Sequence, residues 1–322
     1  MRVLRNYKDV PEDCRNAVVA LGNFDGVHRG HQSVLAMAQE IARDLKAPLG
    51  VLVFEPHPRV FFQPETPAFR LTLLSEKARQ LGNTGVDIVM AFEFDREMAD
   101  TSAEDFVVQV LGKNLGVRHV VVGEDFRFGK DRVGDTDMLR RTALEHGFDA
   151  TFISPFLVDG EICSSSRVRA CLREGQPAQA ASLLGHWWTI EGEVLTGDQR
   201  GRLLGFPTAN LSLQDYVEPK FGVYAVRVRI KDENGNVTES HDGVANIGRR
   251  PTFDKDDVTL EVHIFDFAKD IYGLKVSISL VEFLRPERKF DGLDSLKAQI
   301  AIDSDQARET LALEECASDR FF

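Results

Sequence analysis

Cysteine is scarce in this chain, with four copies among 322 residues, and the four lie far apart. Cys14, Cys163, Cys171 and Cys316 form no CxxC pair, and their spacings fit no zinc-binding pattern. We therefore expect free thiols, no structural disulfide and a reducing compartment, the cytoplasm.

Long hydrophobic runs and an excess of basic charge are also lacking. No window approaches 18 apolar residues and the opening segment has no apolar core, so we expect neither a membrane-spanning helix nor a secretion signal. The 51 acidic residues exceed the 39 basic ones, which gives a net charge of −12. A nucleic-acid-binding protein normally needs a basic surface, so we expect no nucleic-acid and no membrane partner. Small anionic substrates stay open, because a helix N-terminus can bind them.

The length predicts two domains, since a domain usually has about 100–200 residues. In residues 1–185, short apolar runs alternate with stretches of helical periodicity. Strands are expected at 17–21, 49–54, 88–92, 117–122 and 148–153, and helices at 31–45, 73–81, 102–115, 137–146 and 164–174. This alternation is typical of a doubly wound, Rossmann-like parallel α/β sheet, in which ligands bind beyond the carboxyl ends of the strands.

From residue 186 to residue 322, strands dominate. They are expected at 188–196, 222–231, 241–247, 258–266 and 275–283, with a hairpin turn at DENGN, residues 232–236. The alternation of apolar and polar residues favours an antiparallel β-barrel, and a helix is expected over 295–316. Residues 186–322 therefore form the second predicted domain.

The loop after the first strand reads GNFDGVHRGH, residues 22–31, and opens a helix. Its glycines let the backbone approach a phosphate, and His28 and His31 can both donate hydrogen bonds to one polyphosphate. We interpret this HxGH motif as nucleotide-binding rather than as a turn with two surface histidines. Metal binding by the pair is disfavoured, because no third ligand with suitable spacing lies nearby.

Three further segments of the first domain carry polar or aromatic groups. SSSRVR at 164–169 begins a helix; alone it is an ordinary serine cap, but beside HxGH it predicts a second wall of the nucleotide site. GEDFRFG at 123–129 follows a strand, and Asp125 is its polar residue expected to face the site, while Phe126 and Phe128 fit core packing equally well. FEPHP at 54–58 has no role that spacing alone defines.

The second domain contains GRLLGFPTAN, residues 201–210. Thr208 and Asn210 supply two hard oxygens, which suits a Mg²⁺ that takes the rest of its ligands from water and nucleotide phosphates. The alternative is a turn before an ordinary strand. On its predicted strand, Glu261 faces away from Leu260 and Val262, and such a residue is usually solvent-facing. Arg285, in LRPER, either reaches a phosphate or is surface charge.

Over nearly its whole length the chain resembles the bacterial bifunctional riboflavin kinase/FAD synthetases. GNFDGVHRGH, FEPHP, GEDFRFG and SSSRVR resemble the FMN adenylyltransferase half, and GRLLGFPTANL, FGVYAV, GVANIGRRPTF, LEVHIFDF and FLRPERKF resemble the riboflavin kinase half. The serine helix departs from the SSTxIR pattern of the family. Ser166 keeps the hydroxyl and Val168 the apolar side, so we expect the activity to be retained.

The resemblance implies two reactions: riboflavin and ATP give FMN and ADP, and FMN and a second ATP give FAD and diphosphate. It implies that Glu261 is the kinase base and that His28 and His31 act in adenylyl transfer. For the adenylyltransferase it implies ATP contacts from Gly22, Asn23, Phe24, His28, His31, Ser164, Ser165 and Arg167, with Asp125 near FMN or the metal. For the kinase it implies ATP contacts from Gly201, Gly205, Pro207, Thr208 and Asn210, Mg²⁺ on Thr208 and Asn210, and Arg285 at the flavin or phosphate.

Two other functions stay open. A single-activity HxGH adenylyltransferase, of the pantetheine-phosphate or nicotinate type, leaves the PTAN loop and the barrel unexplained. A non-catalytic flavin-binding regulator would be expected to lose His28, His31, Asn210 or Glu261, and all four are present. The expected partners are small molecules, namely riboflavin, FMN and ATP; the sequence does not determine the oligomeric state and leaves weak self-association open.

Overall fold

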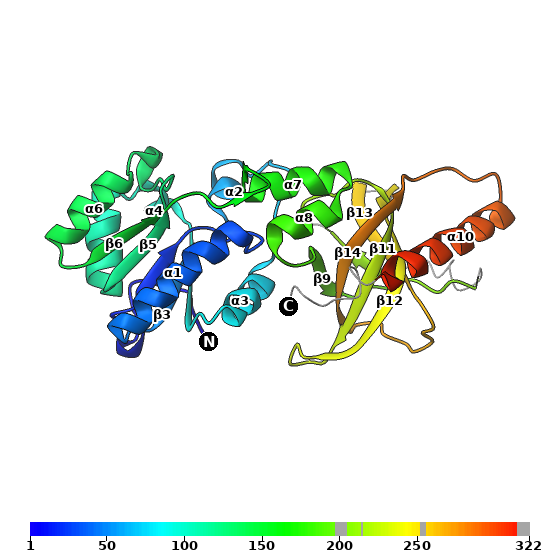
Figure 1. The fold of residues 1–322 in the computed structure, drawn as a ribbon, viewed down its shortest axis with the longest axis horizontal. Coiled ribbons are helices and arrows are strands. Elements are labelled where there is room, and N and C mark those ends of the chain that lie inside the picture. Colours follow the sequence, from blue (N-terminus) through cyan, green and yellow to red (C-terminus); the bar gives the residue numbers. More distant parts are fainter. Residues whose placement is uncertain (197–204, 214, 252–255, 314–322) are drawn as a thin grey trace. The chain divides into compact units, whose positions relative to one another are not determined.

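The computed structural model describes residues 1–196, 205–213, 215–251 and 256–313 (Figure 1). The chain forms two compact units. The first unit consists of Met1–Pro67 and Leu74–Cys163. The second unit consists of Ala68–Leu73 together with the chain from Ser164 onward. The units divide between Cys163 and Ser164, whereas the boundary between functional domains at residues 185 and 186 stays a prediction.

Six parallel strands form the sheet of the first unit, in the order β1-β4-β3-β2-β5-β6. They are β1 (Arg2–Leu4), β2 (Val18–Leu21), β3 (Leu49–Phe54), β4 (Ile88–Phe92), β5 (His119–Gly123) and β6 (Asp149–Ile153). The five predicted strands are confirmed, and the doubly wound sheet with them. Strand β1 was not predicted, because three residues at a sheet edge are too short to show a period.

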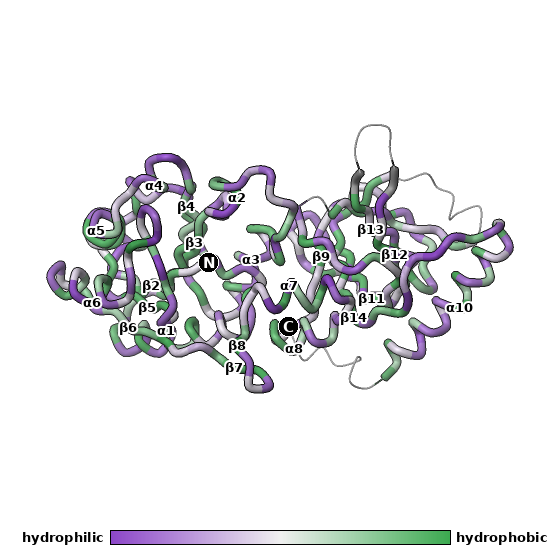
Figure 2. The backbone as a smooth tube through the Cα atoms, turned by 90° about the horizontal axis from the view of Figure 1, so that it is seen from above, coloured by the Kyte–Doolittle hydropathy of each residue, from purple (hydrophilic) through white to green (hydrophobic). Residues whose placement is uncertain are grey.

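Helices cover both faces of this sheet (Figures 1 and 2). The helices of this unit are α1 (Arg29–Leu45), α2 (Pro58–Phe62), α3 (Leu74–Asn83), α4 (Arg96–Asp100), α5 (Ala103–Asp105), the π-helix Phe106–Leu115 and α6 (Thr136–Glu145). The unit also contains short 3-10 turns at Glu12–Cys14 and Lys130–Arg132, and a hairpin formed by β7 (Leu157–Val158) and β8 (Glu161–Ile162). Alternate strand residues enter two apolar clusters. Val18 and Val51 pack with α1 and α3, whereas Val19 and Leu52 pack with the π-helix and α6.

The second unit is a nearly closed antiparallel barrel with the strand order β10-β13-β12-β11-β14-β9. Its strands are β9 (Thr189–Glu193), β10 (Ala209–Ser212), β11 (Gly222–Lys231), β12 (Val237–Pro251), β13 (Asp256–Ile264) and β14 (Lys275–Arg285). A bridge between Leu195 and Asn210 connects the two edge strands. The predicted barrel is confirmed, and so is the hairpin turn, where the Asp232 N–H donates to the Asn236 carbonyl (2.9 Å).

The described part of this unit also contains the helices α7 (Ser165–Glu174), α8 (Pro177–Leu184) and α10 (Leu293–Ala312). Ala181 of α8 and Ala307 of α10 share an apolar cluster with Trp187, Val223 and Val244, so both helices cover the outer face of the barrel (Figure 1). The predicted C-terminal helix is confirmed as α10, and Cys316 lies outside the described residues. Helix α8 was not predicted.

The segment Ala68–Leu73 is fastened within the second unit by its main chain. The Trp188 indole N–H donates to the Leu71 carbonyl (2.9 Å), the Val217 N–H to the Arg70 carbonyl (2.8 Å) and Arg169 Nε to the Phe69 carbonyl (2.6 Å). Residues from the first half of the sequence are therefore part of the barrel unit.

We expect a fragment of residues 164–322 to unfold at least about 5 °C above a fragment of residues 187–322. Both contain the barrel strands and both lack Ala68–Leu73, but only the longer one keeps Ala181 over the cluster formed by Trp187 and Val223. Losing α8 exposes this apolar surface to water. Circular dichroism melting curves of the two fragments provide the comparison, and equal midpoints would show that α8 does not stabilise the barrel.

Candidate functional site

The first candidate site lies where the strand order of the sheet reverses. Strands β2 and β5 are neighbours in the sheet. The strand that follows β2 in the chain, β3, lies on the far side of β2 from β5, and the strand that follows β5, β6, lies on the far side of β5 from β2. In open α/β sheets, ligands bind at this switch point, beyond the carboxyl ends of the strands. The loop that follows β2 carries the HxGH motif, and the loop that follows β5 carries Asp125.

His28 is the N-cap of α1 and is 6% exposed. Its Nδ1 accepts the main-chain N–H of His31 (3.3 Å), and the Cys163 thiol lies 3.7 Å from the same nitrogen. Because Nδ1 is an acceptor, the neutral imidazole carries its proton on Nε2. In this tautomer, the Nε2–H group of His28 is the hydrogen-bond donor of the ring.

His31 completes a compact aromatic stack. Its ring lies 3.6 Å from that of His28, at 20°, and 4.9 Å from the ring of Phe24, which is 1% exposed. A side chain at Gly30 would place its Cβ 3.1 Å from both the Cys163 carbonyl and the His28 ring, which explains the glycine between the histidines. The structure thus brings Phe24, His28 and His31 together.

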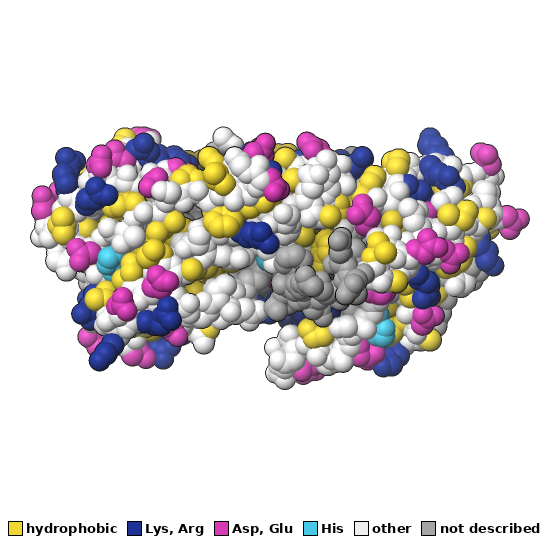
Figure 3. Space-filling view, viewed as in Figure 1, with side chains coloured by type: hydrophobic (Ala, Val, Ile, Leu, Met, Phe, Trp, Pro, Cys, Tyr) yellow, Lys and Arg dark blue, Asp and Glu magenta, His cyan; other side chains and the backbone are white. Residues whose placement is uncertain are grey.

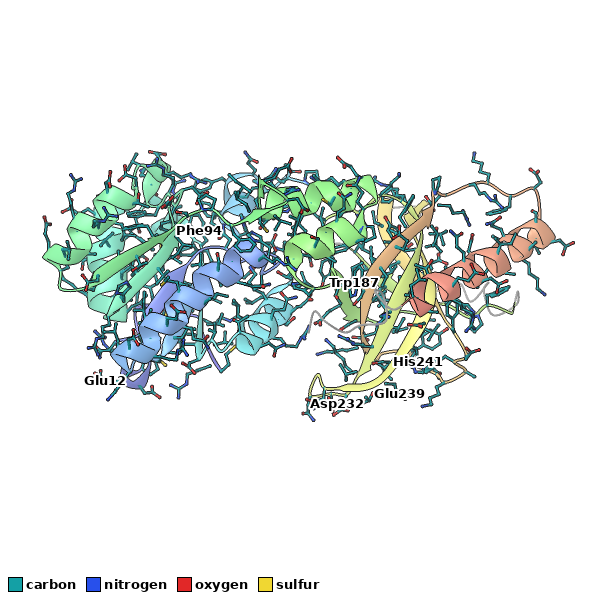
Figure 4. The ribbon with its side chains drawn as sticks, in the orientation of Figure 1. Glu12, Phe94, Trp187, Asp232, Glu239 and His241 are labelled. Atoms are coloured by element: carbon teal, nitrogen blue, oxygen red, sulfur yellow. The ribbon has the colours of Figure 1, made fainter. Side chains whose placement is uncertain are left out.

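A row of phenylalanines lies at the same edge of the sheet. Phe94, labelled in Figure 4, contacts Phe54 at the end of β3 (5.3 Å between ring centroids), Phe61 (5.4 Å) and Phe62 (5.7 Å). Phe62 is 63% exposed, which is unusual for a large apolar side chain. Because these residues follow or end β3 and β4, the row offers an apolar face beside the switch point.

For the other residues predicted at this site, the structure gives only local contacts. Asp125 is exposed, and its Oδ1 would lie 2.9 Å from a Cβ at Gly123. Ser164 caps α7 by accepting the Arg167 N–H (3.3 Å). Ser164, Ser165 and Arg167 belong to the second unit, so their contribution to the site of His28 stays a prediction.

The second candidate site is a row of side chains across three barrel strands. Asn210 of β10 pairs with Glu261 of β13, and Glu261 pairs with Asn246 of β12. Directly paired residues of antiparallel strands point to the same side of a sheet. Leu260 and Val262 are fully buried, so the alternation predicted around Glu261 is confirmed and Glu261 lies on the outer face.

Strand β10 begins at Ala209, so Asn210 lies on a strand and the loop ends at Thr208. A strand therefore follows the turn, as the alternative expected, and the role of residues 201–210 in binding ATP and Mg²⁺ stays a prediction. The Asn210 amide donates weakly to the Thr208 carbonyl (3.5 Å). Gly205 has a φ of 85°, which favours glycine, and Gly201 lies outside the described residues.

Glu287 adds a second carboxylate to the row, and sequence reasoning missed it. The Asn246 amide donates to its Oε1 (3.3 Å), and a Cβ at Gly248 would overlap the Glu287 carboxylate. The LRPER segment therefore reaches the row through its glutamate. Nothing in the sequence could indicate this contact, because it joins residues 41 positions apart.

A cavity of about 330 Å³ opens beside Thr208. Its walls include Pro207, Thr208, Lys269, Asp270 and Tyr272. Lys269 donates to Glu239 (2.7 Å), which also contacts His241 (3.2 Å); Figure 4 labels the last two residues. The hydrogen bond from Lys269 lowers the pKa of Glu239 below its ordinary value, so Glu239 is ionised and holds this wall of the cavity.

Arg285 faces α10. Its guanidinium donates to both carboxylate oxygens of Asp303 (2.7–3.1 Å), and Asp303 is 3% exposed. The Gln299 amide donates to Asp303 (2.6 Å) as well. This buried pair fastens the end of β14 to α10, and the role of Arg285 at the flavin or phosphate stays a prediction.

We expect Asp303→Ala to destabilise the second unit by about 3–5 kcal/mol, because it leaves the part-buried Arg285 charge without its bidentate partner. Asp305→Ala, which removes an exposed carboxylate of the same helix, serves as the matched control. Chemical denaturation of the full chain provides the measurement. Equal midpoints for the two variants would contradict a structural role of the Arg285–Asp303 pair.

Among the described residues, no cluster of three or more histidine, cysteine or acidic side chains has the geometry of a closed metal site. The oxygen-bearing side chains on and beside β10 suit a different kind of site. Mg²⁺ prefers oxygen ligands and is usually bound by one or two protein groups together with water and substrate phosphates. The donors at Thr208, Asn210 and Glu261 fit that chemistry.

Acidic and basic side chains are interspersed over the face drawn in Figure 3. Helices long and apolar enough to cross a membrane are absent from the described part of the chain.

The comparisons with known proteins cover both units. The FAD synthetase family matches residues 10–167, and the riboflavin kinase family matches residues 184–311. The bifunctional riboflavin kinase/FMN adenylyltransferase of Escherichia coli strain K12 is 43% identical over 313 residues, which covers 97% of this chain and 98% of that protein. The protein of the same name from Pseudomonas fluorescens is 41% identical with the same coverage.

A solved structure agrees in fold over both units. The crystal structure titled as a macrolide-efflux protein from Streptococcus pneumoniae is 30% identical and superposes with a TM-score of 0.84, covering 95% of this chain and 98% of that one. The activity in that name is not shared by the two family matches, and the likeness shows a common fold.

Proposed function

We propose, starting from the fact that this chain belongs to the family of bifunctional riboflavin kinase/FMN adenylyltransferases, that it carries out both reactions in separate domains. The C-terminal domain, residues 186–322, converts riboflavin and ATP to FMN and ADP. The N-terminal domain, residues 1–185, converts FMN and ATP to FAD and diphosphate. The observation that carries this proposal is that each unit has its own polar constellation, the stacked histidines in one and the Asn210–Glu261 row in the other.

In adenylyl transfer, a phosphate oxygen of FMN attacks the α-phosphorus of ATP, and the bond from that phosphorus to the diphosphate breaks. No covalent enzyme intermediate is required, so catalysis consists of positioning and charge stabilisation. His28 and His31 donate to the triphosphate at the N-terminus of α1, beside the backbone of Gly22, Asn23 and Phe24.

The remaining residues of the adenylyl-transfer site complete substrate binding. Ser164, Ser165 and Arg167 hold ATP from the start of α7, and Asp125 lies near FMN or the metal. The phenylalanine row around Phe94 gives the flavin ring an apolar face, because aromatic rings gain energy from stacking and from burial.

In the kinase reaction, the ribityl 5′-hydroxyl attacks the γ-phosphorus of ATP and ADP leaves. Glu261 takes the hydroxyl proton as general base, in the row that it forms with Asn210 and Asn246. Gly201, Gly205, Pro207 and Thr208 contact ATP, for which the cavity beside Thr208 provides space. Arg285 contributes positive charge at the flavin or phosphate end.

Thr208 and Asn210 would hold Mg²⁺ together with the ATP phosphates, and the ion would neutralise charge on those phosphates. The same ion is proposed for adenylyl transfer. The proposed compartment is the cytoplasm, where scattered cysteines stay reduced.

The test is to incubate the purified full chain with riboflavin, ATP and Mg²⁺ and to separate the flavins by chromatography. Formation of FMN followed by FAD supports both assignments. FMN without FAD would leave a kinase alone. FAD from supplied FMN, without phosphorylation of riboflavin, would favour the single-activity adenylyltransferase, and the absence of both products would favour a flavin-binding regulator.

A further inference from the structure

A buried lysine lies against the loop that carries the HxGH motif. Lys77 of α3 is 5% exposed, and its ammonium donates to the main-chain carbonyl of Asn23 at 2.8 Å. Lysine is almost never fully buried unless it is paired, because removing its charge from water is costly. Its position in the core beside this loop therefore calls for a specific role.

The bonded carbonyl is at the point where the loop enters an unfavourable conformation. The Asn23 carbonyl belongs to the peptide group that leads into Phe24, whose φ is 47°, and Val27 follows with a φ of 41°. Left-handed backbone is costly for non-glycine residues, above all for a β-branched one such as valine. Surrounding contacts must hold such a loop, and the hydrogen bond from Lys77 is one of them.

The conformation of this loop also determines where the two histidine rings lie. The Phe24 ring contacts that of His31 (4.9 Å), and His31 stacks on His28 (3.6 Å). Any shift of the Asn23–Phe24 peptide moves the Phe24 ring and with it the stack. Where reacting groups must be held in one geometry, a displacement of about 1 Å can cost about 10²-fold in rate.

We propose that Lys77 is a positioning residue for adenylyl transfer: its ammonium holds the Asn23 carbonyl and so fixes the Phe24–His31–His28 stack against the triphosphate. This inference rests on the proposed function of the N-terminal domain. It assigns no substrate contact to Lys77. Two buried carboxylates also belong to these segments, Asp25 close to Asn23 in the loop and Glu76 next to Lys77 on α3, so the inference depends on the hydrogen bond rather than on net charge.

The test compares three substitutions in the full chain. Lys77→Met keeps the length of the side chain but removes the donor, Lys77→Arg keeps a charged donor, and Lys77→Gln keeps a neutral one. We expect Lys77→Met to lower kcat/KM for ATP in the FMN to FAD reaction by about 10- to 100-fold, the range for loss of a charge-assisted hydrogen bond. Lys77→Arg should recover most of this loss, and Lys77→Gln part of it.

Two controls separate positioning from a general loss of structure. Lys113→Met removes an exposed lysine from the π-helix of the same unit and should leave FAD formation unchanged. Riboflavin phosphorylation should stay at the wild-type rate in every variant. If Lys77→Met does not fold, the order of Lys77→Arg, Lys77→Gln and wild type decides the question.

Two outcomes would overturn the inference: a wild-type kcat/KM in Lys77→Met, or equal losses in all three variants, which would indicate packing rather than hydrogen bonding. Failure of the proposed function looks different. In that case the wild-type chain itself makes no FAD from FMN and ATP, and the variants then have nothing to lose.

Discussion

The variants His28→Ala and His31→Ala should each form FAD from FMN and ATP about 10²- to 10³-fold more slowly than the wild-type chain, the usual cost of removing one donor from a preorganised anion-binding site. Both imidazoles occupy the N-terminus of α1 at the switch point of the sheet, where His28 has the tautomer that donates from Nε2. Alanine removes that donor and also one ring of the stack, so the double variant should lose little more than either single one.

The measurement is a pair of initial rates in each variant, FMN to FAD and riboflavin to FMN. Riboflavin phosphorylation should be unchanged, because Glu261 and Asn210 belong to the other unit. His146→Ala, which removes an exposed imidazole at the end of α6, is the matched control. Equal loss of both activities would contradict the assignment of two separate sites.

Glu261→Gln should reduce the riboflavin kinase rate by about 10²- to 10⁴-fold, the contribution typical of general base catalysis. Glutamine keeps the size and the hydrogen-bonding capacity of the side chain between Asn210 and Asn246. It cannot take the proton of the ribityl hydroxyl. FAD formation from supplied FMN should be unaffected.

The control for this variant is Glu282→Gln, which changes an exposed carboxylate on β14 of the same barrel. The kinase rate is measured at saturating ATP and riboflavin, so that altered binding does not conceal the chemical step. A rate for Glu261→Gln within about twofold of wild type would return Glu261 to a solvent-facing surface residue.

Elements with a strong local pattern could be predicted from the sequence. The apolar runs at residues 49–54 and 88–92 coincide with β3 and β4, and the alternation around Glu261 places Leu260 and Val262 in the core. The elements without such a pattern were missed. Strand β1 has three residues, and α8 has an apolar composition with no clear polar face.

The contacts that complete both sites could not be predicted, because they depend on strand register and packing over long separations. Asn246 lies beside Glu261 only because β12 and β13 pair in one particular register. Glu287 and Lys77 reach their partners across 41 and 54 residues. Nothing in the sequence around Glu287 or Lys77 distinguishes these residues from ordinary surface residues.

The segment Ala68–Leu73 affects how this chain can be divided. Its hydrogen bonds to Trp188, Val217 and Arg169 are made inside the barrel unit, while the residues on either side of it return to the other unit. A protease that cuts between Cys163 and Ser164 would therefore yield two polypeptides that still co-elute. The N-terminal polypeptide contains Ala68–Leu73, which stays bound within the unit that the C-terminal polypeptide forms. During synthesis, the barrel unit becomes complete only when it binds Ala68–Leu73, which was made about a hundred positions earlier. A gene split at residue 163 would likewise encode a kinase that lacks part of its own structure.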